Sequence, residues 1–281
     1  MTAASSPSIG LALGGGGARG LAHIAVIEVL DELGLRPAVV AGTSMGAIVG
    51  AAYAAGLSGR DMRRQVTDML RDRTAVFTRL LHARVGRLSQ IFARGHVNPV
   101  LIDGEKFLDL FWPQSVPERF EDLAVPLLVV ATDYYARSEV VIGSGALVSA
   151  VAGSMAIPGL VRPVVLGGRV LIDGGATNPL PFDHLLPRAD LVIAVDVVGG
   201  AARETDGVPD PVETMFGASH IMQAAIVAGK LASGPPHIMV RPAVGTFRGL
   251  DFFKARAILA AADLSKDGLK RDIAAAFETL A

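Results

Sequence analysis

Short apolar runs alternate along the first two hundred residues with longer segments in which apolar residues recur at helical spacing. This alternation is typical of a mainly parallel sheet covered by helices. It predicts strands near residues 9–13, 38–41, 125–131, 138–142, 163–166, 169–172 and 191–197. It also predicts helices over about 18–33 and 45–55, and after residue 200 over about 212–232 and 250–279, around a short strand at 237–240.

Residues 60–120 interrupt this alternation, and we expect them to form a helical cap region. The stretch 60–94 holds nine arginines and three aspartates, a net charge of +6 in a chain whose total is -1. The simpler interpretation is a solvated helical face paired with acids elsewhere. The alternative is a peripheral membrane contact through this basic 60–94 region, with apolar support from Phe77, Leu80, Leu81, Val85 and Leu88.

Composition removes several classes of function. The chain has 281 residues, and its 26 basic and 27 acidic side chains leave no basic excess, so we expect no nucleic-acid partner. The absence of cysteine excludes disulfides, thiolate catalysis and cysteine-ligated metals, and it fits the cytoplasmic location that we expect. Neither an HExxH sequence nor an Asp-rich calcium loop is present, so we expect no metal and no other cofactor.

The apolar character of the chain requires a test for membrane spans. Hydrophobic residues make up 51%, and the mean hydropathy is +0.46. Residues 37–59 and 140–161 carry no charge and are long enough to span, but Gly, Ala, Ser and Thr dominate both. The N-terminus has no basic residue before its glycine-interrupted apolar run. We therefore expect neither a signal peptide nor a transmembrane helix.

The sequence GTSMG, residues 42–46, lies between a predicted strand and a predicted helix. A Gly-x-Ser-x-Gly turn at this place holds its serine in a strained conformation at the start of the helix, where the hydroxyl is exposed as a nucleophile. The same five residues also occur in ordinary tight turns. Ser44 is therefore a candidate nucleophile that needs further support.

A second glycine-rich sequence, GGGGARG at residues 14–20, follows the first strand. It fits the G-x-G-x-x-G pattern of dinucleotide sites, but the second strand ends in Val40-Ala41-Gly42 and lacks the acid that would hold a ribose. No Gly-Lys-Ser/Thr follows, which excludes a P-loop. The remaining interpretation is a loop whose bare amides form an oxyanion hole, with Arg19 adding positive charge.

The third element is LIDGGATNPLP, residues 171–181. Asp173 follows a short apolar strand and precedes two glycines, which can aim a carboxylate from the edge of a sheet into a crowded site. Asp-Gly is also a common hairpin turn, so this sequence alone does not identify a base.

Together, in order and spacing, these elements resemble the bacterial patatin-like phospholipases. The resemblance rests on GLALGGGGARGLAHIAVIEVL, VVAGTSMGAIVGAAYAAG, VPLLVVATD, SMAIPGLVRPVVLGGRVLIDGGATNPLP and ADLVIAVDV. It covers about residues 9–198, whereas 60–120 and a C-terminal helical extension, 200–281, match loosely. The resemblance implies one domain over 1–281, with a three-layer α/β/α patatin-like fold and a mainly parallel central sheet.

The resemblance also implies a Ser-Asp dyad without a catalytic histidine. The nucleophile would be Ser44 and the base Asp173, with an oxyanion hole formed by Gly15, Gly16 and Gly17 and with Arg19 nearby. The implied function is a serine acyl hydrolase, a phospholipase, lysophospholipase or esterase, whose partner is a lipid ester substrate.

Two other functions stay open at this point. A Ser-Asp-His triad esterase or thioesterase could use His184, His220 or His237, which follow Asp173 in the chain. A non-catalytic lipid-sensing or regulatory protein could keep the same fold. We expect His23 to be a structural hydrogen-bonding residue and Ser154 to lie near the site without being the nucleophile. The sequence does not determine headgroup, acyl length or oligomeric state.

Overall fold

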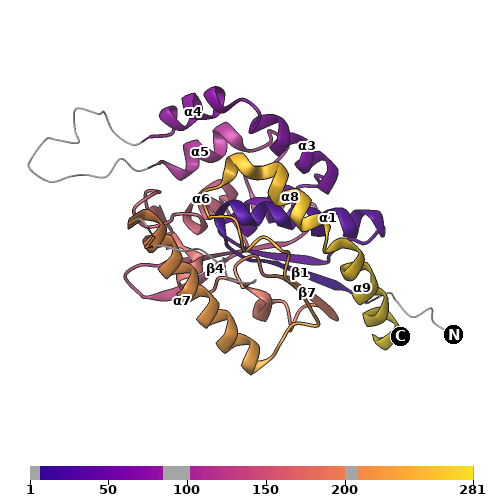
Figure 1. Ribbon diagram of the computed structural model, residues 1–281. Coiled ribbons are helices and arrows are strands. Elements are labelled where there is room, and N and C mark those ends of the chain that lie inside the picture. The colour runs from indigo at the N-terminus through magenta and orange to yellow at the C-terminus, as the bar shows by residue number, and fades with distance from the viewer. Residues whose placement is uncertain (1–6, 85–101, 200–207, 210, 281) are drawn as a thin grey trace, which may run out of the picture.

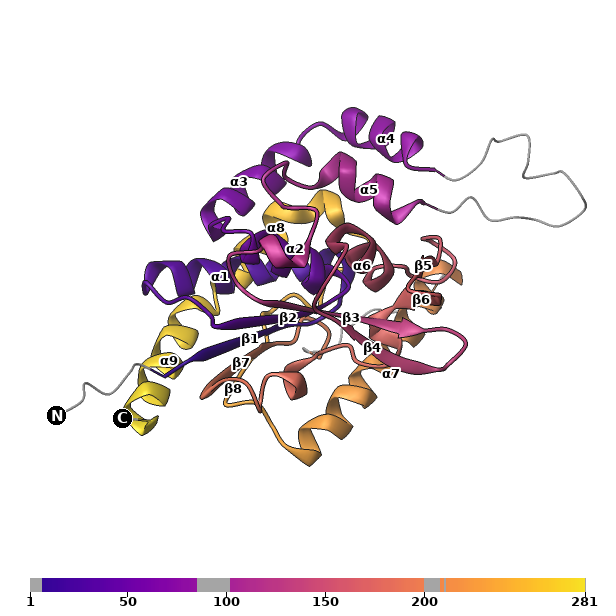
Figure 2. The same cartoon turned by 180° about the vertical axis from the view of Figure 1, so that it is seen from behind.

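One eight-stranded sheet forms the middle layer of the computed structural model, and helices cover both of its faces (Figures 1 and 2). The structure describes residues 7–84, 102–199, 208–209 and 211–280. The strands are β1 (Ile9–Leu13), β2 (Val39–Thr43), β3 (Leu127–Asp133), β4 (Ser138–Ile142), β5 (Val164–Leu166), β6 (Arg169–Asp173), β7 (Leu191–Val195) and β8 (Ile238–Val240).

The sheet is mainly parallel, as the sequence predicted. Its order is β5-β6-β3-β2-β1-β7-β8, with β4 paired to β3. Strands β1, β2, β3, β7 and β8 run parallel, whereas β4 and β6 are antiparallel to β3 and β5 is antiparallel to β6. The chain adds strands on one side of β1 and later places β7 on its other side. Ligands of α/β proteins bind where strand order reverses in this way, at the carboxyl ends of the strands.

Nine α-helices and five short 3₁₀ helices are present in the described part of the chain. The α-helices are α1 (His23–Glu32), α2 (Met45–Ala54), α3 (Gly59–Met69), α4 (Arg73–His82), α5 (Gly104–Phe111), α6 (Leu147–Ser154), α7 (Pro211–Ser233), α8 (Ala255–Asp263) and α9 (Lys266–Leu280). The 3₁₀ helices are η1 (Gly17–Ala22), η3 (Phe120–Asp122), η4 (Gly174–Ala176), η5 (Phe182–His184) and η6 (Phe252–Lys254).

Strand alternation divides the core between the two faces of the sheet. On β1, Leu11 and Leu13 join the larger core with α1, α2, α6 and α8, while Ala12 faces the smaller core around Phe182 and Val227. Helix α7 and η5 therefore lie on the opposite face from α1 and α2 (Figure 2). These layers confirm the predicted three-layer α/β/α architecture.

Three elements differ from the sequence prediction. The first helix begins as η1, where Gly17 has a positive φ of 57°, and becomes α-helical only at His23. The expected helix over 250–279 is divided into η6, α8 and α9. Between α8 and α9, Ser265 bonds back to the Ala262 carbonyl and starts a new turn. Helix α6 was not predicted, since its run of apolar and small residues has no polar side to reveal the helical period.

The segment 60–120 contains α3, α4 and α5 among its described residues. Arg63 on α3 forms ion pairs with Glu28 on α1 and Asp263 on α8, whereas Arg64 pairs with Asp61 on its own helix. Val85 and Leu88, which were expected to support a lipid contact, lie outside the described residues. Among the helices that the structure describes, none combines the length and the apolar character needed to cross a membrane.

Candidate active site

Ser44 occupies a strained turn between β2 and α2. Its φ of 54° and ψ of -119° are unusual for a residue with a side chain. The flanking glycines are required by close backbone contacts, because a Cβ on Gly46 would lie 2.0 Å from the Leu13 carbonyl oxygen, and one on Gly42 would lie 2.5 Å from the Gly46 oxygen. The local sequence thus explains how the turn can present a serine.

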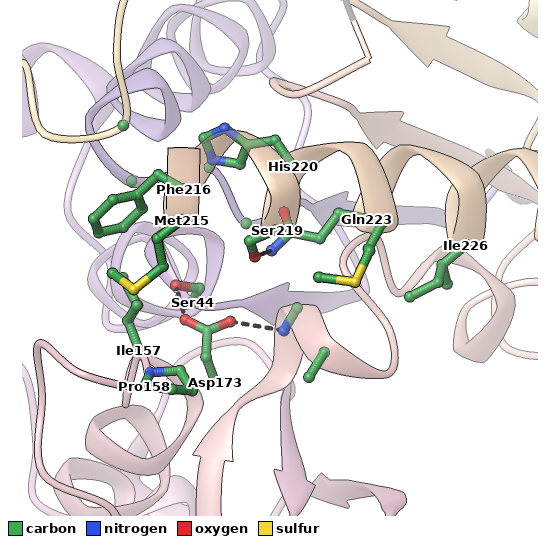
Figure 3. A pocket seen from close by; sticks show the side chains of 17 residues that line it. Ser44, Ile157, Pro158, Asp173, Met215, Phe216, Ser219, His220, Gln223 and Ile226 are labelled. Carbon is green, nitrogen blue, oxygen red and sulfur yellow. Dashed lines mark hydrogen bonds between the residues drawn. The ribbon is translucent and has the colours of Figure 1, made fainter. Parts of the chain in front are cut away.

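The hydroxyl of Ser44 points at Asp173. Ser44 Oγ donates a hydrogen bond of 2.7 Å to Asp173 Oδ2, and both residues are buried (Figure 3). The main-chain N–H of Ser44 donates to Ser154 Oγ at 2.8 Å, and the Ser154 hydroxyl donates to the Val130 carbonyl at 2.6 Å. Ser154 therefore holds the Ser44 turn against the end of β3, a contact that the sequence did not indicate.

Asp173 stands at the junction of β6 and η4. Its second carboxylate oxygen, Oδ1, accepts the Gly175 N–H at 2.7 Å. Burial raises the pKa of Asp173 to about 6, although the hydrogen bonds from Ser44 and Gly175 act in the opposite direction. The carboxyl group is therefore ionised at neutral pH, and it is more basic than an exposed aspartate.

The glycine loop lies between β1 and η1. The N–H of Gly15 is already used, because it donates to the Pro179 carbonyl at 2.9 Å. Among the described residues, the N–H groups of Gly16 and Gly17 donate to no protein acceptor. A Cβ on Gly17 would lie 2.2 Å from the Gly249 oxygen, so this position admits only glycine. Two amides of the loop are thus available to a ligand.

His23 holds the glycine loop through a hydrogen bond to Gly14. Its Nε2 donates to the Gly14 carbonyl at 2.8 Å, and the ring is fully buried. Burial lowers the pKa of His23 to about 4, so the ring is neutral at physiological pH. This geometry fits the expected structural hydrogen-bonding role.

The Arg19 side chain hydrogen-bonds to groups other than Ser44 and Asp173. Its Nε donates to the Phe247 carbonyl at 2.8 Å, and its Nη2 lies 3.4 Å from His220 Nδ1. Burial, helped by the charge of Arg19, lowers the pKa of His220 to about 4. Arg19 therefore connects the start of η1 to the 247–249 loop and to α7, and it does not line the pocket.

No described histidine contacts either Ser44 or Asp173 through a hydrogen bond. His184 Nε2 bonds to Glu139, His237 Nδ1 accepts the Val192 N–H at 3.0 Å, and His220 bonds to Arg19. His96 lies outside the described residues.

Glu139, Asp183 and His184 place three potential metal-ligating atoms within 4.8 Å of one another. Two other side chains, Lys230 and Asn178, already donate hydrogen bonds to the carboxylates of this cluster. Lys230 Nζ donates to Asp183 at 2.6 Å, and Asn178 Nδ2 donates to Glu139 and Asp183 at 3.0 Å each. The two carboxylates are thus balanced by Lys230 and by His184, whose pKa is raised by its hydrogen bond to Glu139.

Ser44 and Asp173 open into a cavity of about 360 Å³. The glycine loop forms one side of it, and α7 crosses over the two residues (Figure 3). Apolar side chains dominate its walls: Ile157, Pro158, Met215, Phe216, Met222 and Ile226. The polar α7 residues Ser219, His220 and Gln223 complete the lining. Sequence reasoning missed α7 as part of the site, although residues 214–229 form an unusual helical run without a formal charge.

Residues 11–186 match the family model described as patatin-like phospholipase. An uncharacterized NTE family protein of Mycobacterium tuberculosis is 40% identical over 206 residues, which cover 72% of this chain and 53% of that protein. Human patatin-like phospholipase domain-containing protein 6 is 33% identical over 202 residues, 71% of this chain and 14% of that protein. The lysophospholipase NTE1 of Kluyveromyces lactis is 31% identical over 198 residues, 69% of this chain and 13% of that protein.

The matched part of this chain spans about half the length of the mycobacterial relative and a smaller share of the eukaryotic proteins. Among solved structures, VipD from Legionella pneumophila has a similar fold, with a TM-score of 0.50 and 16% identity, over 95% of this chain and 67% of that one. The family model covers the glycine loop, the Ser44 turn and Asp173 in a single continuous match. This chain belongs to the patatin-like phospholipase family.

Proposed function

We propose that this chain is a serine acyl hydrolase that cleaves carboxyl esters of lipids, with Ser44 as the nucleophile and Asp173 as the general base. The observation that carries the proposal is the 2.7 Å hydrogen bond from Ser44 Oγ to Asp173 Oδ2 at the base of an apolar pocket. A strained serine, a partly activated base and two available amides are what acyl transfer requires.

The acylation step begins with attack of Ser44 Oγ on the ester carbonyl carbon, while its proton passes to Asp173. The negative charge that develops on the carbonyl oxygen is stabilised by the N–H groups of Gly16 and Gly17. The carbon–oxygen bond to the alcohol then breaks, and Asp173 returns the proton to the leaving oxygen. The products of this half-reaction are the free alcohol and an acyl ester on Ser44.

The deacylation step uses water as the nucleophile. Asp173, ionised again, takes a proton from a water molecule that attacks the acyl carbon. The tetrahedral species collapses, Ser44 recovers its proton from Asp173, and the fatty acid leaves. The same carboxylate thus serves both halves of the reaction.

Two observations support a lipid ester as the substrate. The walls of the cavity are mostly aliphatic, aromatic and thioether side chains, which suit an acyl chain. Relatives of this chain carry the names patatin-like phospholipase and lysophospholipase. A triad is less well supported, because His184, His220 and His237 bond to groups other than Ser44 and Asp173.

Ester turnover tests the proposal. A soluble p-nitrophenyl ester and ester-containing vesicles are given to the wild type, Ser44→Ala, Asp173→Asn and the control Ser233→Ala, whose serine lies at the exposed end of α7. We expect Ser44→Ala to lose activity and Asp173→Asn to fall by about 10²–10⁴ in kcat, the range for a positioned base, while Ser233→Ala matches the wild type. Circular dichroism checks that each variant folds. Full turnover by Ser44→Ala contradicts the proposal, and an inactive wild type favours the lipid-sensing alternative.

A further inference from the structure

Helix α7 carries apolar side chains on its outer face as well as on its inner face, although only the inner face is buried. Residues 214–229 contain no Asp, Glu, Lys or Arg, and this run extends for about 24 Å at 1.5 Å per residue. Its inner face packs on the protein through Val227 and lines the pocket with Phe216 and Ile226. The outward face of a surface helix normally carries charged and polar side chains, and the outer face of α7 does not.

The outer face of α7 consists of Ala218, Ile221, Met222, Ala225 and Ala228, and all five residues are exposed. Ile221 is 73% exposed and Met222 60%. Exposed apolar side chains that gather in one contiguous patch mark a contact surface, whereas single ones scattered over a surface do not.

The charged residues at the two ends of this run form ion pairs with other residues of the same chain. Glu213 pairs with Arg248 at 3.1 Å, and Lys230 pairs with Asp183 at 2.6 Å. His220 is neutral because burial and Arg19 lower its pKa to about 4. The outer face therefore carries no ionic group that would keep it hydrated or that would select a charged partner.

The outer face is continuous with the wall of the pocket. Met215 and Met222 are 48% and 60% exposed, and both also line the cavity above Ser44 and Asp173. In Figure 3, Met215 lies opposite Ile157 and Pro158 at the side of the cavity. An apolar path thus runs from the outside of α7 into the site.

We propose that the outer face of α7 docks on the surface of a lipid bilayer, so that an ester moves from the bilayer into the pocket past Met215 and Met222. This inference rests on the proposed function. A second protein copy fits the face less well. It would cover the methionines at the mouth of the pocket without supplying an ester, whereas a bilayer would supply one. One helix face is also narrow compared with the roughly 800 Å² per partner that a stable protein interface buries.

Because the outer face of α7 is uncharged, membrane docking through it can be distinguished by experiment from docking through the basic stretch 60–94. Docking through α7 depends on apolar burial, so it does not require anionic lipid and is not weakened by salt. Docking through arginines would require anionic lipid and would weaken as salt screens the charges.

Sedimentation with vesicles tests the proposal. The vesicles are made of neutral diether phosphatidylcholine, which has no ester to cleave, and are compared with vesicles that also contain an anionic diether lipid, at low and high salt. The test variant is Ile221→Glu/Ala225→Glu, which places two charges on the outer face without changing a residue that lines the pocket. The matched control is Leu264→Glu, because Leu264 is 81% exposed at the end of α8.

We expect the wild type and Leu264→Glu to bind neutral vesicles at both salt concentrations, and the double glutamate variant to bind at least about tenfold more weakly. Turnover of the soluble p-nitrophenyl ester should be equal in all three proteins. Equal vesicle binding by the double variant, no binding by the wild type, or binding only to anionic vesicles at low salt would overturn the proposal. A wild-type dimer that the double variant dissociates, measured by light scattering, would overturn it as well.

If the wild type binds neutral vesicles but hydrolyses neither soluble nor vesicle esters, the proposed function fails while the docking surface stands. If it hydrolyses the soluble ester and the double variant still binds vesicles, docking through α7 fails while the proposed function stands.

Discussion

At the residue scale, the environment of Asp173 determines what this site can do. An exposed aspartate has a pKa of about 3.9 and is a poor base for a hydroxyl group. Burial raises the pKa of Asp173 to about 6, which brings its proton affinity closer to that needed at neutral pH and still leaves it ionised there. The hydrogen bond from Ser44 Oγ places the serine proton directly against this carboxylate.

The proposed mechanism makes turnover depend on pH through this pKa. Only ionised Asp173 can accept the serine proton, so kcat/KM for a neutral soluble ester should be constant above about pH 7 and half-maximal near pH 6. Below pH 6 it should fall about tenfold per pH unit. Initial rates between pH 4.5 and 8.5 measure this profile, and the residual activity of Asp173→Asn should lack the step. A flat profile, or the same step in Asp173→Asn, would argue against this base.

Gly16 offers a test of the oxyanion site. A Cβ at this position would lie 2.5 Å from Val197 Cγ2, so alanine should push the loop and its free N–H away from the ester oxygen. We expect Gly16→Ala to lower kcat by about 10²-fold, the usual loss for one misplaced donor. Adding Val197→Ala should restore part of kcat by making room for the new methyl group. Wild-type turnover by a folded Gly16→Ala protein would remove Gly16 from the proposed oxyanion hole.

At the element scale, the site is built where separate elements meet. The turn between β2 and α2 carries Ser44, and the junction of β6 with η4 carries Asp173. The C-terminal residue of α6 connects the Ser44 turn to β3, since Ser154 accepts the Ser44 N–H and donates to the Val130 carbonyl. The strained Ser44 turn is therefore held by a buried side chain from a third element.

Ser154→Ala tests this connection. The variant leaves the Ser44 N–H and the Val130 carbonyl without their buried partner, which should destabilise the protein by about 1–3 kcal/mol. Because the strained turn is then free to relax, kcat should also fall while KM for a soluble ester changes little. Urea unfolding and steady-state kinetics give the two values, with Ser233→Ala, at the exposed end of α7, as the control. Unchanged stability and kcat would show that Ser154 does not hold the turn.

The sequence predicted β1 as a short apolar run that ends at the glycine loop, and it predicted α2 from its place between the Ser44 turn and Gly56. It did not predict α6, because every side of that helix is apolar or small, and it did not predict that η1 is 3₁₀ rather than α-helical. The local motifs around Ser44 and Asp173 each allowed an ordinary turn. Their pairing is a contact over 129 residues, which only the family resemblance or the folded structure could indicate. The role of α7 depends on tertiary packing. In the sequence, only the absence of charged residues from 214–229 indicates that role.

At the scale of the whole molecule, a partly buried ion cluster joins the C-terminal helices to the family domain. Glu28 on α1 accepts hydrogen bonds from Arg63 on α3 and Lys266 on α9, and Arg63 also pairs with Asp263 on α8. Burial alone would raise the pKa of Glu28, but the bonds and charges of Arg63 and Lys266 outweigh this effect and lower it. We propose on this basis that residues 1–281 unfold as one domain.

Replacing Glu28 tests this coupling. Glu28→Ala leaves Arg63 and Lys266 partly buried without their shared carboxylate, which should cost about 2–4 kcal/mol in the free energy of unfolding. Glu32→Ala is the control, because its pair with Lys270 is exposed and should contribute less than about 1 kcal/mol. Since the folded pKa of Glu28 is lowered, its stabilising contribution is present above the unfolded pKa and is lost as pH falls through the folded one. Urea unfolding at pH 7 and at low pH measures both effects, and equal losses in the two variants would contradict them.

The most direct test of the Ser44–Asp173 account is the site and rate of modification by a fluorophosphonate, followed by intact mass and peptide mapping. The account predicts one adduct, on Ser44, which forms at least about 10²-fold more slowly in Asp173→Asn. His184→Gln and His237→Asn should react like the wild type, and His220→Asn, which alters the pocket wall, should stay within about tenfold of it. An adduct on another serine, or a folded histidine variant that no longer reacts, would contradict the account.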